Sequence, residues 1–178
     1  MRVLGIDPGT LTTGYGIVEK GQGGRLIHVC DGEIKAASKK ALPERLLAIG
    51  DSLKKVIAEF SPDCMAVESV FFARNVKSAL VLGHARGVVF FTAAAMGVSV
   101  FEYSPRKVKQ AVTGYGGAEK GQVQKMVSLL LRTTPLQGPD AADALALAIC
   151  HIHHIPPRAP LRKCGGVSLL QAVSLKKL

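Results

Sequence analysis

The sequence contains no uncharged apolar run long enough to span a membrane. Its most apolar stretch, Val76 to Val100, is interrupted by glycine, histidine and arginine at positions 83, 84 and 86, whereas a spanning helix needs about 20 predominantly apolar residues. The apolar run that follows the first two residues ends at Asp7 and is too short for the core of a secretory signal. We therefore expect a cytoplasmic protein with no membrane partner.

Cysteine patterns that form disulfide scaffolds are also missing. The four cysteines are scattered and form no CxxC pair, so they fit reduced thiols without a catalytic role. Cys150 clusters with His151, His153 and His154, and thiolate with imidazole is a zinc-type ligand set. Because the spacing matches no closed four-ligand pattern, we interpret this cluster as a helix end with solvated histidines.

Acidic residues are scarce: 13 Asp and Glu stand against 23 Lys and Arg, for a formal net charge of +10. The segment 71–132 holds nine basic residues and only two acidic ones. Such an excess is typical of a protein that binds a polyanion, although a basic face can also simply be solvated. We expect a nucleic-acid partner, contacted in part by Arg74, Lys77 and Lys107 from this basic segment.

Long polar tracts of the kind found in disordered proteins are absent, and 48% of the 178 residues are hydrophobic, which predicts one compact domain. Period-two and helical patterns alternate along the chain and predict an α/β fold, a mixed five-stranded sheet flanked by helices. We expect the domain to cover residues 1–154. The remaining residues, 155–178, include five basic residues and no acidic one, and we expect them to form a mobile basic tail that adds nonspecific DNA affinity. The expected strands are 2–7, 14–20, 25–35, 64–68 and 98–103, and the expected helices are 42–60, 76–97, a short basic helix opened by Ser104-Pro105, 119–132 and 139–154.

The expected helix over 76–97 is apolar on nearly every face, with Gly83 and Gly87 at the spacing of small residues. Such a helix is either buried on all sides or packed against another subunit. We take it as the candidate interface of a homodimer.

Four acidic residues occupy positions where a carboxylate costs folding free energy unless a cation or another partner compensates its charge. Asp7 and Glu68 each end an apolar strand, and Asp140 and Asp143 lie three residues apart in the first turn of the last helix, which places them on one face. If the strands are neighbours under that helix, the four carboxylates converge and raise one another's pKa. Mg²⁺ takes carboxylate oxygens, and two such ions could catalyse phosphodiester hydrolysis. Taken one at a time, these acids could serve as a helix cap, a turn residue or a salt-bridge partner. Taken together, they favour a metal-dependent nuclease.

Five ordered segments over residues 1 to about 154 closely resemble the RuvC-type Holliday junction resolvases. They are GIDPGTLTTGYG (5–16), VESVFFARN (67–75), FEYSPRKVKQ (101–110), GAEK (117–120) and PDAADALA (139–146). The resemblance implies a ribonuclease-H-like fold, a homodimer, two Mg²⁺ ions per active site with Mn²⁺ as a possible substitute, and paired symmetric cuts in a four-way DNA junction that leave 5′-phosphate ends. It also implies cooperation with the RuvA and RuvB branch-migration complex in recombination and repair.

The same resemblance assigns roles to individual residues. Lys109 and Lys120 correspond to basic residues near the scissile phosphate or the DNA backbone, and Phe71 corresponds to an aromatic pressed against bases at the crossover. Phe71 could also pack in the core beside Phe72, but two successive rings do not share one face of an extended segment. The metal-binding catalytic acids implied by the match are Asp7, Glu68, Asp140 and Asp143.

Two other classes of function compete with this one. The segment from Asp7 to Gly14 resembles the phosphate-binding hairpin of sugar-kinase, Hsp70 and actin-like ATPases, but those enzymes pair two such domains and this chain has the length of one. A noncatalytic DNA-binding module would explain the basic surface and leave the four acids unexplained.

Overall fold

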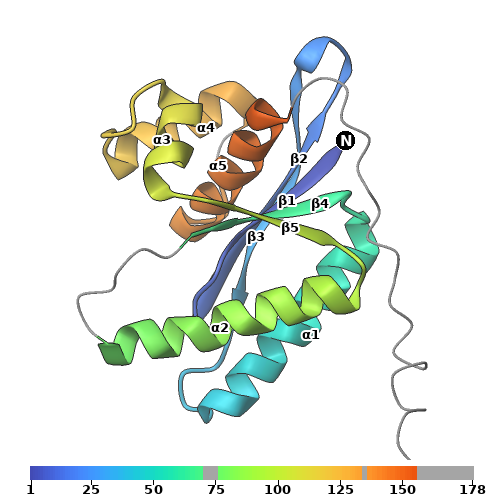
Figure 1. Ribbon diagram of the computed structural model, residues 1–178, viewed down its shortest axis with the longest axis vertical. Helices are drawn as coiled ribbons and strands as arrows, with labels where there is room; N and C mark the ends of the chain where they lie inside the picture. Colours follow the sequence, from blue (N-terminus) through green and yellow to red (C-terminus); the bar gives the residue numbers. More distant parts are fainter. Residues whose placement is uncertain (70–75, 134–135, 156–178) are drawn as a thin grey trace, which may run out of the picture.

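A computed structural model describes residues 1–69, 76–133 and 136–155. Its centre is a five-stranded mixed sheet in the order β3-β2-β1-β4-β5 (Figure 1). Two antiparallel hairpins join the first three strands, whereas β4 and β5 lie parallel to β1. The strands are β1 (Arg2–Asp7), β2 (Thr12–Lys20), β3 (Leu26–Lys35), β4 (Cys64–Glu68) and β5 (Ser99–Tyr103). The mixed five-stranded sheet predicted from the sequence is confirmed.

Helices cover both faces of the sheet, and each face has its own hydrophobic core. The helices α1 (Leu42–Phe60) and α2 (Val76–Ala95) lie on one face (Figure 1). On the other face lie α3 (Pro105–Thr113), α4 (Lys120–Leu131) and α5 (Pro139–His154). The fold is therefore three layers thick, with the sheet in the middle.

Local sequence signals explain where these helices begin and end. In α1 the buried residues Ile49, Leu53 and Ile57 recur every four positions, which aligns them on the face toward the sheet. Helix α3 begins after Ser104, whose hydroxyl accepts a hydrogen bond from the Lys107 N–H at 3.3 Å, as an N-cap does. It ends at Gly114, which adopts a positive φ of 79° that glycine tolerates without strain.

Glycines in the first two strands let α5 lie directly on the sheet. A Cβ at Gly5 would collide with the carbonyl oxygen of Ala144, and a Cβ at Gly14 would collide with that of Asp140. Gly5 and Gly14 face α5, and Asp7, two residues after Gly5 and paired with Gly14, points to the same side because side chains alternate along a strand. The first turn of α5 is thereby brought close to the end of β1.

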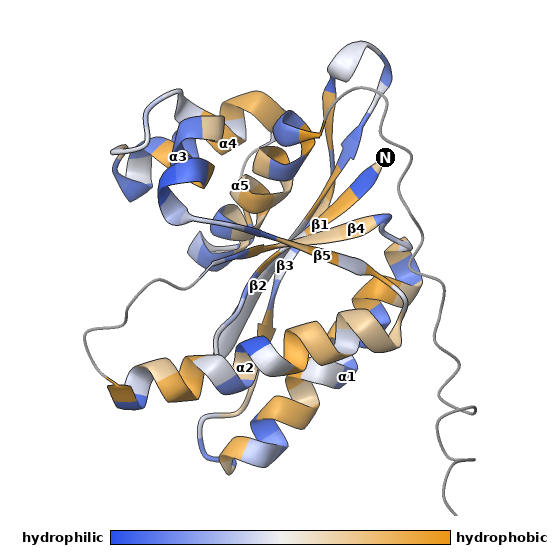
Figure 2. Cartoon of the chain, viewed as in Figure 1, coloured by the Kyte–Doolittle hydropathy of each residue, from blue (hydrophilic) through white to orange (hydrophobic). Residues whose placement is uncertain are grey.

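The prediction for the apolar helix is corrected in one respect. Burial of α2 on all sides is wrong, because Val76, Leu80 and Phe91 are 74%, 63% and 70% exposed, and Figure 2 shows apolar residues along this outer helix. Within the described parts of the chain, α2 is the one helix long and apolar enough to cross a membrane, with 22% of its apolar window buried. The other alternative, packing of α2 against another subunit, stays a prediction.

The histidine cluster at the end of α5 also differs from expectation. His151 is 1% exposed: its Nε2 lies 3.0 Å from the Sγ of Cys64 and its Nδ1 2.7 Å from the hydroxyl of Tyr103. Burial, with a smaller contribution from His154, lowers the pKa of His151 to about 4. The expectation of solvated histidines is wrong for His151, which ties α5 to β4 and β5, and correct for the exposed His153 and His154.

Candidate active site

Three of the four predicted acids form a tight group at one edge of the sheet. Strands β1 and β4 pair in parallel up to Ile6 and Val67, so the last residues of the two strands, Asp7 and Glu68, lie at the same edge of the sheet. The first turn of α5 lies over this edge, and one carboxylate oxygen from each of Asp7, Asp140 and Asp143 lies within 4.8 Å of the others. These three residues could hold a metal ion.

Glu68 lies beside this group rather than within it. It lines a cavity of about 250 Å³ together with Asp7 and Asp143. Walls of the cavity come from α3, α4 and α5, through the side chains of Pro105, Val108, Val123, Ala146 and Leu147. The sequence predicts that four carboxylates converge. In the structure Asp7, Asp140 and Asp143 lie close together, and Glu68 lines the adjacent cavity.

The electrostatics of the acids reflect their crowding. Burial, followed by the charges of Asp143, Glu68 and Asp140, raises the pKa of Asp7 to about 7. Burial and then Asp143 raise the pKa of Glu68, whereas Arg86 and two lysines oppose the rise. A cation between the carboxylates would remove this repulsion, because an opposite charge favours the ionised form.

Two lysines from different helices border the same cavity. Lys120, the first residue of α4, places its Nζ 2.6 Å from Oδ2 of Asp143, and this hydrogen bond is the main reason that the pKa of Lys120 is raised. Lys109 reaches the cavity from α3. The structure thus brings to one cavity the two lysines for which the sequence resemblance implies a place near the scissile phosphate or the DNA backbone; that role stays a prediction.

Two of the other predicted DNA-binding residues, Lys107 and Lys77, do not line this cavity. Lys107 places its Nζ 5.2 Å from the centre of the Tyr103 ring, and Lys77 borders a separate hollow with Thr10 and Ser78. Phe71 and Arg74 lie outside the described residues. Any contact of these four residues with DNA stays a prediction.

Sequence reasoning missed Arg86, which supports Glu68 from α2. Its guanidinium donates hydrogen bonds to the backbone carbonyl of Glu68 and to the carboxylate of Glu102, and it lies 4.7 Å from the centre of the Phe90 ring. It therefore joins the ends of β4 and β5. The one available signal was a lone arginine inside an apolar helix, which in the sequence only argued against a membrane span.

The sheet order, the helix laid across β1 and β2, and the acid-lined cavity flanked by lysines define a nuclease of the ribonuclease-H-like class. The family model for crossover junction endodeoxyribonuclease RuvC matches residues 3–151. A crossover junction endodeoxyribonuclease RuvC from Sphingopyxis alaskensis is 50% identical over 154 residues, which cover 86% of this chain and 98% of the relative. The chain therefore belongs to the RuvC family of crossover junction endodeoxyribonucleases.

Solved structures agree with this assignment. The RuvC of T. thermophilus, determined in complex with a Holliday junction substrate, superposes with a TM-score of 0.80 at 36% identity and covers 85% of this chain and 92% of that one. Membership of this family decides against the actin-like ATPase and the noncatalytic DNA-binding module. The ribonuclease-H-like fold and the nuclease class implied by the sequence resemblance are confirmed, whereas the catalytic and metal-binding roles of the four acids stay a prediction.

Proposed function

We propose that this protein resolves four-way DNA junctions by paired, symmetric, metal-dependent hydrolysis of phosphodiester bonds, leaving 5′-phosphate ends. The observation that carries the proposal is the group of Asp7, Asp140 and Asp143, whose carboxylate oxygens lie within 4.8 Å of one another. The family match over residues 3–151 supports it, as does the junction substrate bound by the T. thermophilus relative.

The donor set fits Mg²⁺. All candidate ligands are carboxylate oxygens, which hard cations prefer. Burial and then the neighbouring carboxylates raise the pKa of Asp7 to about 7, and a bound cation would relieve this repulsion. Asp7, Asp140 and Asp143 would hold one ion, and Glu68 across the cavity could share a second with Asp7. When bound there, Mg²⁺, or Mn²⁺ in its place, would supply an activated water and stabilise the leaving oxygen.

The protein's own side chains contribute charge and position. Lys120 is paired with Asp143 at 2.6 Å and can turn from this carboxylate to a phosphate oxygen when DNA enters. Lys109 faces the same cavity. Positive charge placed beforehand at this point stabilises the negative charge that grows on the phosphate in the transition state. We assign Phe71 to stacking on a base at the crossover and Arg74, Lys77 and Lys107 to the DNA backbone.

A homodimer suits a substrate with two equivalent strands to cut, because an isologous pair supplies two active sites at a fixed separation. The outer stripe of α2 is the proposed interface, with Val76, Leu80 and Phe91 exposed and open space around Gly87. Leu80→Glu should convert the protein to a monomer in sedimentation velocity experiments. Leu47→Glu, at a leucine of α1 that is 64% exposed, is the matched control and should leave the dimer intact.

Two further parts of the proposal concern partners and the tail. The sequence resemblance supports cooperation with the RuvA and RuvB complex. Truncation after His154 removes five basic residues, so the dependence of junction affinity on salt should become shallower, by up to about four in the log–log slope. An unchanged slope would show that the tail adds no DNA contact.

The central test uses a synthetic four-way junction with each strand labelled in turn, and a linear duplex of the same sequence. With Mg²⁺, the wild type should cut two opposite strands of the junction and leave the duplex intact. Asp7→Asn should still bind the junction and cut nothing. Asp51→Asn, at a half-exposed acid of α1 paired with Lys54, should cut like the wild type. Cutting by Asp7→Asn at the wild-type rate would refute the proposed site.

A further inference from the structure

The short loop before α5 is held by an acid on the edge strand β3. Oδ2 of Asp31 accepts a hydrogen bond from the backbone N–H of Gln137 at 2.8 Å, across 106 residues of sequence. Oδ1 of the same carboxylate lies 2.8 Å from Nε2 of His28. The side chain of Asp31 is only 5% exposed, so its two oxygens are committed to these two partners.

A β-bulge makes this arrangement possible. Residues three apart in a regular strand point to opposite faces of the sheet, which would separate His28 from Asp31. The pairing of β3 with β2 shifts at this point, because Cys30 pairs with Ile17 but His28, not Val29, pairs with Val18. The extra residue restores both side chains to one face.

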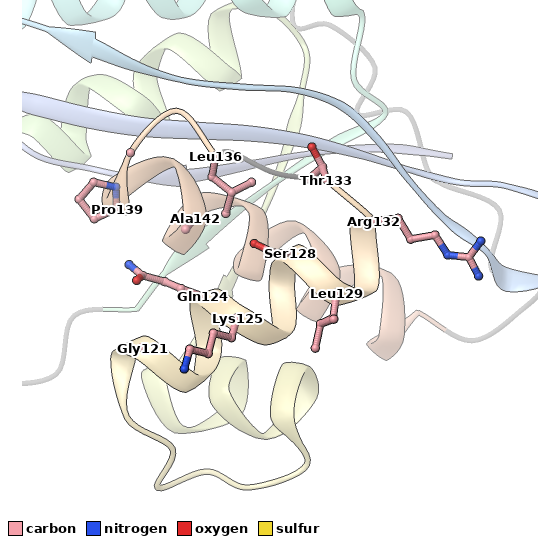
Figure 3. Close-up of a pocket in the computed structure, with 11 residues that line it drawn as sticks. Gly121, Gln124, Lys125, Ser128, Leu129, Arg132, Thr133, Leu136, Pro139 and Ala142 are labelled. Atoms are coloured by element: carbon pink, nitrogen blue, oxygen red, sulfur yellow. The ribbon is translucent and has the colours of Figure 1, made fainter.

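Among the described residues of this loop, Leu136 packs against the hydrophobic core on this face of the sheet, and the side-chain hydrogen bond from Asp31 is joined by a close contact at Gly138. Helix α5 begins after Gly138, which provides no side-chain cap, and a Cβ at this glycine would collide with the carboxylate of Glu33. Among the described residues, the side of the loop that faces α4 borders a groove of about 1040 Å³; Figure 3 shows Leu136 and Pro139 across this groove from Gln124 and Ser128. The contacts of Gln137 and Gly138 with β3 therefore fix the backbone immediately before α5, next to the core packing of Leu136.

We infer that Asp31, oriented by His28, is a positioning residue for the metal site. Its hydrogen bond to Gln137 fixes the backbone two residues before α5 begins at Pro139 and three residues before Asp140. The close contacts at Gly5 and Gly14 set how near α5 lies to the sheet, and the hydrogen bond to Gln137 fixes the backbone that leads into its first turn. The distance between Asp140 on α5 and Asp7 on β1 depends on both. This inference rests on the proposed function, because it takes Asp7, Asp140 and Asp143 as the metal ligands.

The test compares Asp31→Ala with Asp31→Asn. The alanine variant loses both hydrogen bonds, whereas the asparagine amide can still accept from the Gln137 N–H and donate to His28. Loss of an outer partner of a metal ligand weakens metal binding by about 10- to 100-fold. We expect Asp31→Ala to raise the half-saturating Mg²⁺ concentration for junction cutting, and the dissociation constant for Mn²⁺ in calorimetry of the DNA-free protein, by about 10-fold. Asp31→Asn should restore both values to within about threefold of the wild type, while junction affinity without divalent ions stays unchanged in all variants.

Asp51→Ala controls for the loss of one negative charge, because Asp51 lies on α1 with a half-exposed side chain. Thermal unfolding confirms that each variant is folded at the assay temperature. Unchanged metal dependence in Asp31→Ala, or equal defects in Asp31→Ala and Asp31→Asn, would overturn the inference. If the wild type binds Mn²⁺ about 10-fold more tightly than Asp31→Ala yet cuts no junction, the positioning role stands and the proposed function fails.

Discussion

Asp7→Asn should abolish cutting and, in the absence of metal, make the folded protein more stable at pH 8. Asp7 is partly buried beside three other carboxylates, and this environment raises its pKa from 3.8 to about 7. At pH 8 the metal-free protein must therefore keep an unfavourable charge at this position. Asparagine has almost the same shape and carries no charge, so the substitution removes the repulsion together with a metal ligand.

The size and the pH window of the effect follow from the pKa. A raised pKa in the folded state means that the fold binds the proton more tightly than the unfolded chain does, so the contribution of Asp7 to stability is complete below pH 3.8 and is lost as the pH rises through about 7. At 1.36 kcal/mol for each pKa unit, the loss by pH 8 is about 4 kcal/mol. Because the asparagine amide must still be buried, we expect a net gain of about 2 to 4 kcal/mol, or about 5 to 15 °C in Tm for a domain of this size.

Thermal unfolding in EDTA from pH 4 to pH 8 measures this gain. The difference in Tm between Asp7→Asn and the wild type should be small at pH 4, grow toward pH 7 and then level off. Added Mg²⁺ should stabilise the wild type and not the variant. Asp51→Asn should stay within about 0.5 kcal/mol of the wild type at every pH, as exposed substitutions usually do. A gain that is the same at pH 4 and pH 8, or a loss at pH 8, would contradict the reasoning.

Three further predictions address the lysine, the glycine face and the buried histidine. Lys120→Gln should slow single-turnover cutting by about 100-fold with junction affinity nearly kept; a loss confined to affinity would refute a role at the phosphate. Gly14→Ala should push α5 away from β2, destabilise the fold by about 1 to 3 kcal/mol in urea unfolding and weaken Mg²⁺ binding, whereas Gly121→Ala, with open space around it, should do neither. The pKa of His151 falls from 6.5 to about 4 on folding. Its contribution to the stability of the fold is therefore complete above pH 6.5 and decreases by about 3 kcal/mol as the pH falls to about 4. His151→Gln should lack this acid-dependent loss of stability, and a pH profile of unfolding equal to that of the wild type would contradict the assignment.

Much of the fold could be predicted because local signals agree with one another. The helix over Leu42–Phe60 has a helical apolar period, a proline in its first turn and a Ser-Pro pair after its end, and the structure has these same bounds. The meeting of Asp7 and Glu68 followed from a simple rule, since the ends of neighbouring parallel strands lie at one edge of a sheet. A pair of acids three apart at a helix start completed the prediction of the site.

What the sequence could not reveal depends on contacts between distant residues. Hydropathy does not distinguish a helix that is buried within one chain from a helix that packs between two chains, so the sequence of α2 is compatible with both. The contact of His151 with Cys64 and Tyr103 joins three elements, and no spacing along the chain encodes it. Likewise, the role of Asp31 depends on a bulge that alters which residues share a face.

The most direct test of the account is the anomalous diffraction of a crystal of this protein soaked in Mn²⁺. We predict anomalous density bounded by the carboxylates of Asp7, Asp140 and Asp143, and none at this place in Asp7→Asn crystals. Ordered carboxylates with no manganese between them, in a crystal that binds manganese elsewhere, would contradict the claim that these acids form the metal centre.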